Sequence, residues 1–449
     1  MRWRSDQFFF LFLIFFLSGC IASPEVIDDI RTLPQDNALY LTPSTANHEV
    51  ITRQRQLEIC EDFKHQFFLP WKMTAPSNTQ ADLCGEFSKY RSKPGYGENS
   101  RKRTGEWFEG LARNADLETY PNAGFKAITI DSSDLRLLPT EKPHFSSLKA
   151  DGTGYPFDNL QNSAIPPNTP IYIAQVTRDK SWVLAESSYG SGWLPVRDVA
   201  RVDPKLIGVW ERSGYIALTR DDVAVYDDNG TFLFEASLGS IFPKRDEDDE
   251  NYHILVARAD EQRNAQIRRA IIPRNAAVIQ PLSVTPANIA KMANELINKP
   301  YGWGGLHRNR DCSSMLKDLY APFGIWMPRH SSHQALEGGS YIDLSSLTPD
   351  AKEQMILQRG VPFLTLISVK GHIMLYLGTK HGRAIVFHNL WGIKTRDWLG
   401  GEGRKVVGRA TITTLHPGAE LPDVDLSNGD LLTKVEGMTL LVVCPVVSY

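Results

Sequence analysis

The strongest constraint on the fold is a central stretch in which short apolar runs alternate with turns. Between about residues 127 and 279 these runs have the spacing and composition of short β-strands. One of the turns, Asn229-Gly230, is typical of a tight hairpin. Many short strands in succession favour small closed sheets, so we expect one small barrel over residues 126–206 and a second over residues 207–282.

Helical patterns precede the β stretch. Apolar residues are interspersed with charges from His48 to Trp71, where Pro70 is expected to end the helix, and a second helical pattern surrounds Trp107. Residues 46–125 are therefore predicted to form a small helical unit.

The last part of the chain, residues 283–449, also begins with helix signals. Thr285 can cap a helix and Pro286 suits its first position, after which apolar residues recur at i, i+3, i+4, i+7 and i+8. Helices that flank two blocks of short strands place the whole chain in the α+β class.

Composition excludes several classes of protein. The 449 residues contain 49 Lys and Arg against 52 Asp and Glu, without the basic excess that a nucleic-acid backbone requires, so no nucleic-acid partner is expected. Five Cys are too few for a disulfide scaffold, and there is no Cys-x-x-Cys pair. We expect no cofactor, and the oligomeric state stays open, with a monomer as the expectation.

The N-terminus has the features of an export signal. Arg2 and Arg4 precede an unbroken apolar run over residues 8–17, which is shorter than the roughly 20 residues that cross a bilayer. The sequence Leu17-Ser18-Gly19-Cys20 then resembles a bacterial lipobox.

That resemblance implies that residues 1–20 are a lipoprotein signal and that Cys20 carries the lipid. Because Ile21 follows, and not the Asp that retains such proteins at the inner membrane, it implies the periplasmic face of an outer membrane. Residues 21–45 lack a sustained period and are expected to be a tether.

A cysteine at a predicted helix start is the candidate nucleophile. Asp311-Cys312-Ser313-Ser314 precedes Met315, Leu316 and Leu319 at helical spacing, so Cys312 is expected in the first turn. The positive end of the helix dipole favours a thiolate there.

Cysteine nucleophiles require a histidine base and a group that orients it. His372 and His388 lie in two predicted strands joined by a polar turn, equally far from Lys380. A symmetric hairpin would place the two imidazoles directly opposite each other, and a slip of one residue in register would separate them.

Other readings of these residues stay open at this point. A lone Cys is often a small buried apolar residue, as we expect for Cys444, and one Cys with two His suits a triad or a zinc site, although the sequence has no His-Glu-x-x-His motif. Cys60 and Cys84 would form a disulfide in an oxidising compartment or remain free.

Several motifs together resemble NlpC-type papain-like cell-wall peptidases, and two further motifs resemble the bacterial SH3 module that precedes such domains. The peptidase motifs are Tyr301-Gly302-Trp303-Gly304-Gly305, Asp311-Cys312-Ser313-Ser314, Met327-Pro328-Arg329-His330-Ser331, Gly371-His372-Ile373-Met374 and Phe387-His388-Asn389-Leu390-Trp391-Gly392. The SH3 motifs are Tyr155-Pro156-Phe157-Asp158-Asn159-Leu160-Gln161-Asn162-Ser163 and Tyr189-Gly190-Ser191-Gly192-Trp193.

The resemblance implies hydrolysis of the γ-D-glutamyl–diamino acid bond in peptidoglycan stem peptides, limited to peptides with a free N-terminal L-Ala. It assigns Cys312 as nucleophile, His372 as base and His388 as its orienting partner. The remaining implied positions bind substrate: Tyr301 at the oxyanion, Asp311 and Ser313 at the L-Ala end, Trp303 as a wall, and Tyr189 from the first barrel. Asp311 would pair with the free ammonium of the L-Ala or, alternatively, only cap the following helix.

Two rival functions follow from the same features. A wall-binding lipoprotein with a decayed catalytic domain would use only its SH3 modules, but the intact Cys312, His372 and His388 argue against it. An amidase or acyltransferase on the same fold would need a cleft that accepts a glycan or a lipid.

Overall fold

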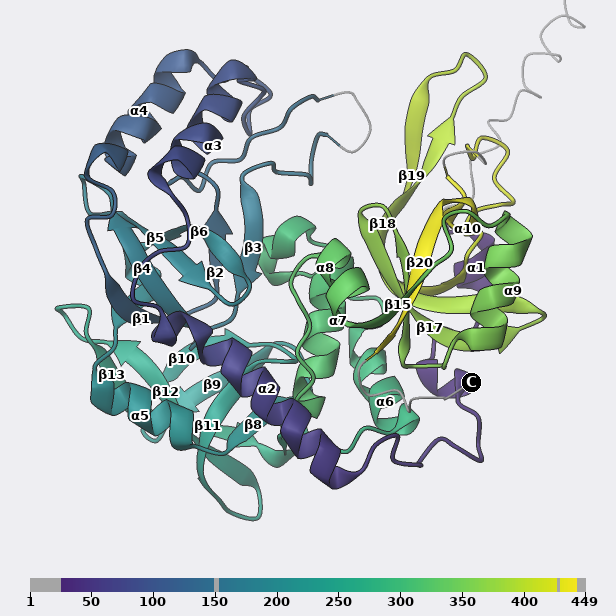
Figure 1. The fold of residues 1–449 in the computed structure, drawn as a ribbon, viewed down its shortest axis with the longest axis horizontal. Coiled ribbons are helices and arrows are strands. Elements are labelled where there is room, and N and C mark those ends of the chain that lie inside the picture. The colour runs from purple at the N-terminus through teal and green to yellow at the C-terminus, as the bar shows by residue number, and fades with distance from the viewer. Residues whose placement is uncertain (1–25, 149–152, 426–428, 442–449) are drawn as a thin grey trace, which may run out of the picture.

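The computed structural model describes residues 26–148, 153–425 and 429–441. Three antiparallel sheets and a helical N-terminal region form the molecule, which confirms the α+β class (Figure 1). The predicted signal segment with Cys20, and the strand expected around Cys444, lie outside the described residues. None of the helices in the described ranges is both long and apolar enough to cross a bilayer.

The N-terminal helical unit contains three main helices: α2 (Arg53–Lys72), α3 (Gln80–Ser92) and α4 (Gly105–Ala115). Pro70 does not end α2 as expected, because the helix continues to Lys72. A proline removes the hydrogen bond to the carbonyl four residues before it, and Ser188 of the first barrel donates a hydrogen bond to that carbonyl, Gln66 O. The helix α3, which we did not predict, begins at a capping box formed by Thr79 and Asp82.

Each β block forms its own seven-stranded antiparallel sheet, in the regions expected for the two barrels. The first sheet contains β1 (Phe125–Thr129), β2 (Ser133–Arg136), β3 (Gln161–Ile165), β4 (Pro170–Val176), β5 (Trp182–Ser187), β6 (Gly190–Pro195) and β7 (Val199–Arg201). After α5 (Pro204–Arg212), the second contains β8 (Tyr215–Leu218), β9 (Val223–Asp227), β10 (Phe232–Ala236), β11 (Ile241–Glu247), β12 (Asn251–Ala259), β13 (Ala265–Pro273) and β14 (Ala277–Ile279).

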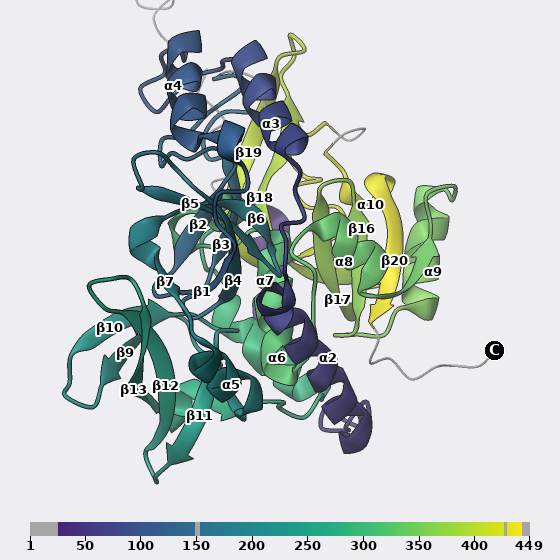
Figure 2. The same ribbon diagram turned by 60° about the vertical axis from the view of Figure 1, so that its left-hand side comes forward.

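The long helix α2 packs where these two sheets meet (Figure 2). Its buried aromatic residues share one core with Ile128 of the first sheet and Tyr215 of the second. Trp71 is fully buried there and donates its indole N–H to Ala127 O at 2.7 Å. This helix therefore holds the two barrels together.

The C-terminal domain packs helices on a six-stranded sheet of order β15-β20-β16-β17-β18-β19. The strands are β15 (Gly339–Asp343), β16 (Thr365–Val369), β17 (His372–Lys380), β18 (Arg383–Arg396), β19 (Glu402–Thr414) and β20 (Val435–Leu441). The helices are α6 (Pro286–Leu296), α7 (Cys312–Tyr320), α8 (Ser331–Glu337), α9 (Pro349–Arg359) and α10 (Leu431–Lys434). As predicted, Thr285 caps α6, and α7 packs on the strands that carry the two histidines.

Residues 27–45 do not form the expected tether. Two short helices, α1 (Asp28–Thr32) and η1 (Asn37–Tyr40), lie against the catalytic domain. Ile27 is buried among apolar residues of β18, and the Gln35 side chain donates to Ile412 O and accepts from Ile412 N. The sequence of residues 27–45 has no helical or strand pattern of its own. Hydrogen bonds to the edge strand β19 hold this segment in place.

Candidate active site

Cys312 is the first residue of α7, and Asp311 is its N-cap. The Asp311 carboxylate accepts the Ser314 backbone N–H at 2.8 Å, and the Ser314 hydroxyl lies 2.9 Å from the backbone N of Asp311, which donates to it. Cys312 is only 6% exposed. At the first position of a helix its own backbone N–H has no acceptor within the helix, so it is available to a ligand oxygen.

The two predicted histidines meet, and the contact continues to a threonine on the next strand. His372 Nε2 lies 2.8 Å from His388 Nδ1, and His388 Nε2 lies 3.0 Å from the Thr413 hydroxyl oxygen. The hydroxyl proton of Thr413 is donated to Thr414 O, so His388 Nε2 must carry the proton in the second contact. His388 Nδ1 then accepts from His372 Nε2, which leaves His372 Nδ1 unprotonated and able to act as a base.

The histidines are diagonal neighbours and not directly opposite, as the symmetric hairpin would have them. The tight turn lies between Lys380 and Arg383, and β17 contains a bulge. Extending the observed register places His372 opposite Leu390. The shift from the expected register is two residues, which preserves the face of each side chain, and a diagonal pair of long side chains can still touch.

Burial determines the protonation states of Cys312 and His372, the predicted nucleophile and base. It raises the pKa of the Cys312 thiol to about 12, with the neighbouring Asp311 carboxylate adding to the effect, and it lowers the pKa of His372 to about 4. The direction of this shift opposes the thiolate expected at the helix N-terminus. The Ile373 backbone N–H, which faces the sulfur, lowers the thiol pKa but does not offset burial.

Asp311 already has a cationic partner, so its charge is not left unpaired when no substrate ammonium is present. The buried Arg329 guanidinium contacts Asp311 Oδ1 at 3.1 Å and Oδ2 at 2.7 Å, and it lowers the pKa of that carboxyl. Arg329 also donates to the Ser313 hydroxyl at 2.9 Å and to the Ser163 hydroxyl of the first barrel at 2.8 Å. Ser313 is thus occupied by the same network.

Tyr301 and Trp303 lie in an aromatic wall that the first barrel completes. The Tyr301 ring contacts Trp391, and the Trp303 ring contacts Phe157 of the first barrel edge-to-face at 5.1 Å. Trp303 also donates its indole N–H to Asp158 O at 3.1 Å. Burial raises the pKa of Tyr301, and its proximity to Cys312 and Asp311 adds to the effect, so the phenol stays protonated near the sulfur as a donor.

The loop after Trp303 is held against strand β3 of the first barrel. Gly304 and Gly305 both have positive φ, at +60° and +90°. A Cβ on Gly305 would lie 2.5 Å from the Ala164 Cβ, and one on Gly304 would lie 2.6 Å from Gln161 Cγ. Only glycine allows this approach.

Tyr189 is not placed beside the nucleophile. Its ring is buried, stacks on Trp326 at 5.3 Å, and has the Lys317 ammonium over it at 4.4 Å. Lys317 lies five residues after Cys312 on α7, about 7–8 Å along the helix. Tyr189 therefore packs the interface between barrel and helix, and Phe157 is the barrel side chain that reaches the aromatic wall.

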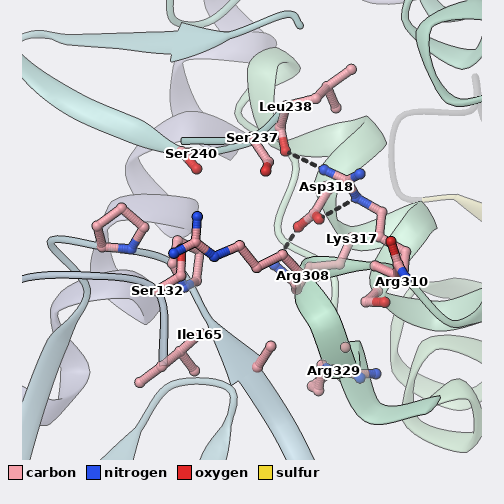
Figure 3. A pocket seen from close by; sticks show the side chains of 16 residues that line it. Ser132, Ile165, Ser237, Leu238, Ser240, Arg308, Arg310, Lys317, Asp318 and Arg329 are labelled. Carbon is pink, nitrogen blue, oxygen red and sulfur yellow. Dashed lines mark hydrogen bonds and ion pairs between the residues drawn. The ribbon is translucent and has the colours of Figure 1, made fainter. Parts of the chain in front are cut away.

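The second barrel holds the chain just before the nucleophile through charges. Buried Arg310 forms two 2.8 Å hydrogen bonds to Asp221 of the second barrel, and it contacts Asp318 of α7 at 2.7 Å. Figure 3 shows Arg310 and Asp318 at a hollow where both barrels meet α7, with Ser132 and Ile165 on one side and Ser237, Leu238 and Ser240 on the other. Cys312, His372 and His388 are not part of its lining.

Sequence reasoning missed Thr413, the pairing of Arg329 and the role of Phe157. Arg329 and Phe157 stand within motifs that were recognised, but their partners are distant along the chain. Thr413 carries no signal in the sequence. Cys60 and Cys84 are both free in the structure, so they form no disulfide with each other.

Comparisons with known families agree with this architecture. Residues 298–397 match the NlpC/P60 family, residues 9–120 match the N-terminal NLPC_P60 stabilising domain, and residues 143–195 and 203–249 match SH3 domains of the SH3b1 and SH3b2 types. A comparison with curated protein sequences gives no match.

Among solved structures, an NlpC/P60 endopeptidase from Photobacterium damselae subsp. piscicida superposes with a TM-score of 0.80 at 28% identity, over 92% of this chain and 97% of that one. An NlpC/P60 family protein from Bacillus cereus gives a TM-score of 0.46 at 15% identity, over 71% of this chain and 99% of the other.

Proposed function

The chain is a cysteine peptidase with the catalytic domain of the NlpC/P60 family, and we propose that it hydrolyses the γ-D-glutamyl–diamino acid bond of peptidoglycan stem peptides. The observation that carries this proposal is the hydrogen-bonded series from His372 through His388 to Thr413, together with the Cys312 sulfur facing the backbone N–H of Ile373, the residue after His372. In this arrangement Cys312 is the nucleophile and His372 is a base of defined tautomer. The Tyr301 phenol is the nearby hydrogen-bond donor.

The proposed reaction begins with both members of the reactive pair neutral. The sulfur of Cys312 attacks the γ-carbonyl carbon while its proton passes to His372 Nδ1. Asp311 raises the pKa of His372 and so stabilises the imidazolium that forms. Tyr301 and the Cys312 backbone N–H are the candidate donors to the oxyanion.

Collapse of the tetrahedral intermediate breaks the amide bond and gives a thioester. His372 passes the proton to the leaving amine of the diamino acid. Water then attacks the thioester as His372 takes a proton from it, and that proton returns to the sulfur when the γ-glutamyl carboxylate leaves. No atom or electron from a cofactor is needed.

For substrate choice we propose a steric limit to stem peptides that carry no glycan. The first barrel lies against the Trp303 loop through Phe157, Asp158 and Gln161, which supports a cleft closed at that end. Because Arg329 satisfies Asp311, the amine itself is not the proposed determinant. A small cap on L-Ala should then cost less than a muramic acid with its glycan strand.

The experiment compares hydrolysis of three substrates by mass spectrometry: L-Ala-γ-D-Glu-diaminopimelate, its N-acetyl form, and the glycan-attached stem. We expect cleavage of the first two at rates within about tenfold, and a loss of at least about a hundredfold on the third. Equal rates on glycan-attached stems would refute the steric limit. Products cut at another bond, or transfer of the acyl group to an amine, would refute the proposed reaction.

Variants test the assignment of the residues. Cys312→Ala should abolish cleavage, and His372→Ala should be nearly as severe. His388→Ala should be milder because it leaves nucleophile and base in place. Thr413→Val removes the hydroxyl at nearly constant volume and should lower kcat about tenfold with little change in KM, whereas Thr413→Ser should restore it. Full activity in Cys312→Ala would exclude the mechanism.

We also propose that Cys20 is lipidated and anchors the protein in the cell envelope, at the periplasmic face of an outer membrane. The lipobox-like sequence supports this. Cys20→Ser should release the protein from membrane fractions without altering its specific activity. Unchanged sedimentation with membranes would contradict the anchor.

A further inference from the structure

The hairpin of β18 and β19 extends beyond the rest of its sheet (Figure 1). Two exposed apolar side chains lie at its tip. Trp398 is 90% exposed and Leu399 is 74% exposed, the two highest values among the large apolar residues that the structure describes. Large apolar side chains that lie together at an exposed tip indicate an interaction site.

The backbone of this tip satisfies its own hydrogen bonds. Asp397 N donates to Gly401 O, and Gly400 N donates to Asp397 O, both at 2.9 Å. The Asp397 carboxylate accepts the backbone N–H groups of Leu399 and Gly401 at 2.9 and 2.7 Å. A turn that satisfies its own amides can leave water at low cost, and this is the condition for entering a lipid surface.

Charge around the tip favours an anionic surface. Residues 394–405 contain four basic side chains, Lys394, Arg396, Arg404 and Lys405, against Asp397 and Glu402. Lys394 pairs with Glu402 and Arg396 with Asp425, so the basic excess around the tip is one charge. Basic residues next to Trp and Leu are the combination found in segments that lie at the headgroup level of anionic bilayers.

The first residues that the structure describes pack against the same hairpin. Ile27 packs against Leu390 and Ile393 of β18, and only six residue steps separate Cys20 from Val26. At roughly 3.5 Å per residue these steps span at most about 21 Å. Trp398 is five steps beyond Ile393, about 17 Å along the strand. A lipid on Cys20 and the hairpin tip can therefore reach the same bilayer surface.

We propose that Trp398 and Leu399 insert into the headgroup region of the membrane and act as a second contact beside the lipid on Cys20. This goes beyond the proposed peptidase reaction, and its geometry rests on the proposed lipidation. Two contacts, one covalent and one on the catalytic domain, fix the orientation of that domain relative to the bilayer, which a single lipid cannot do.

The test measures binding of the tip without the acyl chain. The mature chain from residue 20 onward, with Cys20→Ser and without the apolar signal segment, is mixed with vesicles of phosphatidylethanolamine and phosphatidylglycerol, and the bound fraction is measured by flotation. We expect Trp398→Ser with Leu399→Ser to lower the partition coefficient at least about tenfold. Val406→Ser, which removes another exposed apolar residue of the same hairpin, is the matched control and should bind as the parent does.

Two further measurements separate the outcomes. Cleavage of the soluble tripeptide should be unchanged in the tip variant, so failure of the peptidase proposal and failure of the membrane proposal are distinguishable. Equal vesicle binding by the tip variant and its parent would overturn the inference. Loss of binding to isolated sacculi with vesicle binding retained would overturn it as well and assign the tip to glycan.

Discussion

The two barrels contact the same catalytic segment with different chemistry. The buried contacts of the first barrel with the Trp303 loop and Arg329 are neutral: ring contacts, one indole donor, one amide and the Ser163 hydroxyl. A charged contact there, Asp131 with Arg308 at 3.6 Å, is exposed. The second barrel meets Arg310 with the Asp221 carboxylate, and both side chains are buried. The residues that these contacts reach, Trp303, Arg310 and Arg329, all lie within 17 positions of Cys312 in the sequence.

The difference indicates a division of labour between the barrels. Neutral contacts can be lost singly at modest cost, and those of the first barrel border the wall where substrate is proposed to bind. A buried ion pair gives little net stability when it forms, but breaking it leaves an unpaired charge. The second barrel is thus placed to fix the backbone before the nucleophile, and the first barrel is placed to shape substrate access.

The largest expected effect comes from breaking the contact of the second barrel. Arg310→Met should lower the free energy of unfolding by about 3–5 kcal/mol, because Asp221 and Asp318 lose their shared guanidinium. Urea unfolding measures this change. Asp221→Asn is the matched control with a smaller loss, since Arg310 keeps its ion pair with Asp318. A change below about 1 kcal/mol in Arg310→Met would contradict the proposed role of this ion pair.

The pH dependence of activity should be set by residues of the catalytic domain and not by the contacts of the two barrels. Burial lowers the pKa of His372 to about 4, so the base stays neutral, and activity should persist well below pH 6.5 and fall only as the pH drops through about 4. The raised pKa of the thiol predicts slow alkylation by iodoacetamide at neutral pH.

The kcat/KM profile, with circular dichroism as the control for folding, measures this acid limb. Variants of either barrel contact should keep it unchanged. Fast alkylation of Cys312 at pH 6, with an alkaline limb near pH 8, would instead indicate a thiolate–imidazolium pair.

Phe157→Ala tests the wall that the first barrel completes. We expect an increase in KM of about tenfold for the free tripeptide with kcat nearly unchanged, because the ring touches Trp303 and no reacting group. Tyr189→Phe is a matched control on the same barrel, since it keeps the stacked ring. A fall in kcat with constant KM would place Phe157 in the chemistry.

The smallest effect is expected from Ser163→Ala. It removes one of several hydrogen bonds to Arg329, so stability should fall by about 1 kcal/mol and kcat/KM by less than about fivefold. Differential scanning calorimetry and initial rates measure both quantities. A loss as large as that of Arg310→Met would show that the two barrel contacts do not differ as proposed.

Local patterns in the sequence determined the elements and the chemistry that they carry. Thr285 and Pro286 start a helix, Asp311 caps the helix of Cys312, and alternation along two strands places His372 and His388 on one face. These features depend on residues close in the chain. For the same reason the two-residue error in register did no harm, since side-chain direction repeats every two residues.

Only the tertiary structure decided which side chains pair with the site residues and which protons those residues carry. Arg329 pairs with Asp311, Thr413 fixes the His388 tautomer from a third strand, and residues 27–45 pack on the catalytic domain. The helix dipole favours a thiolate at Cys312, but burial under two strands outweighs it. Such outcomes depend on desolvation and on contacts between distant segments, and no local pattern encodes how deeply a side chain is buried or what faces it.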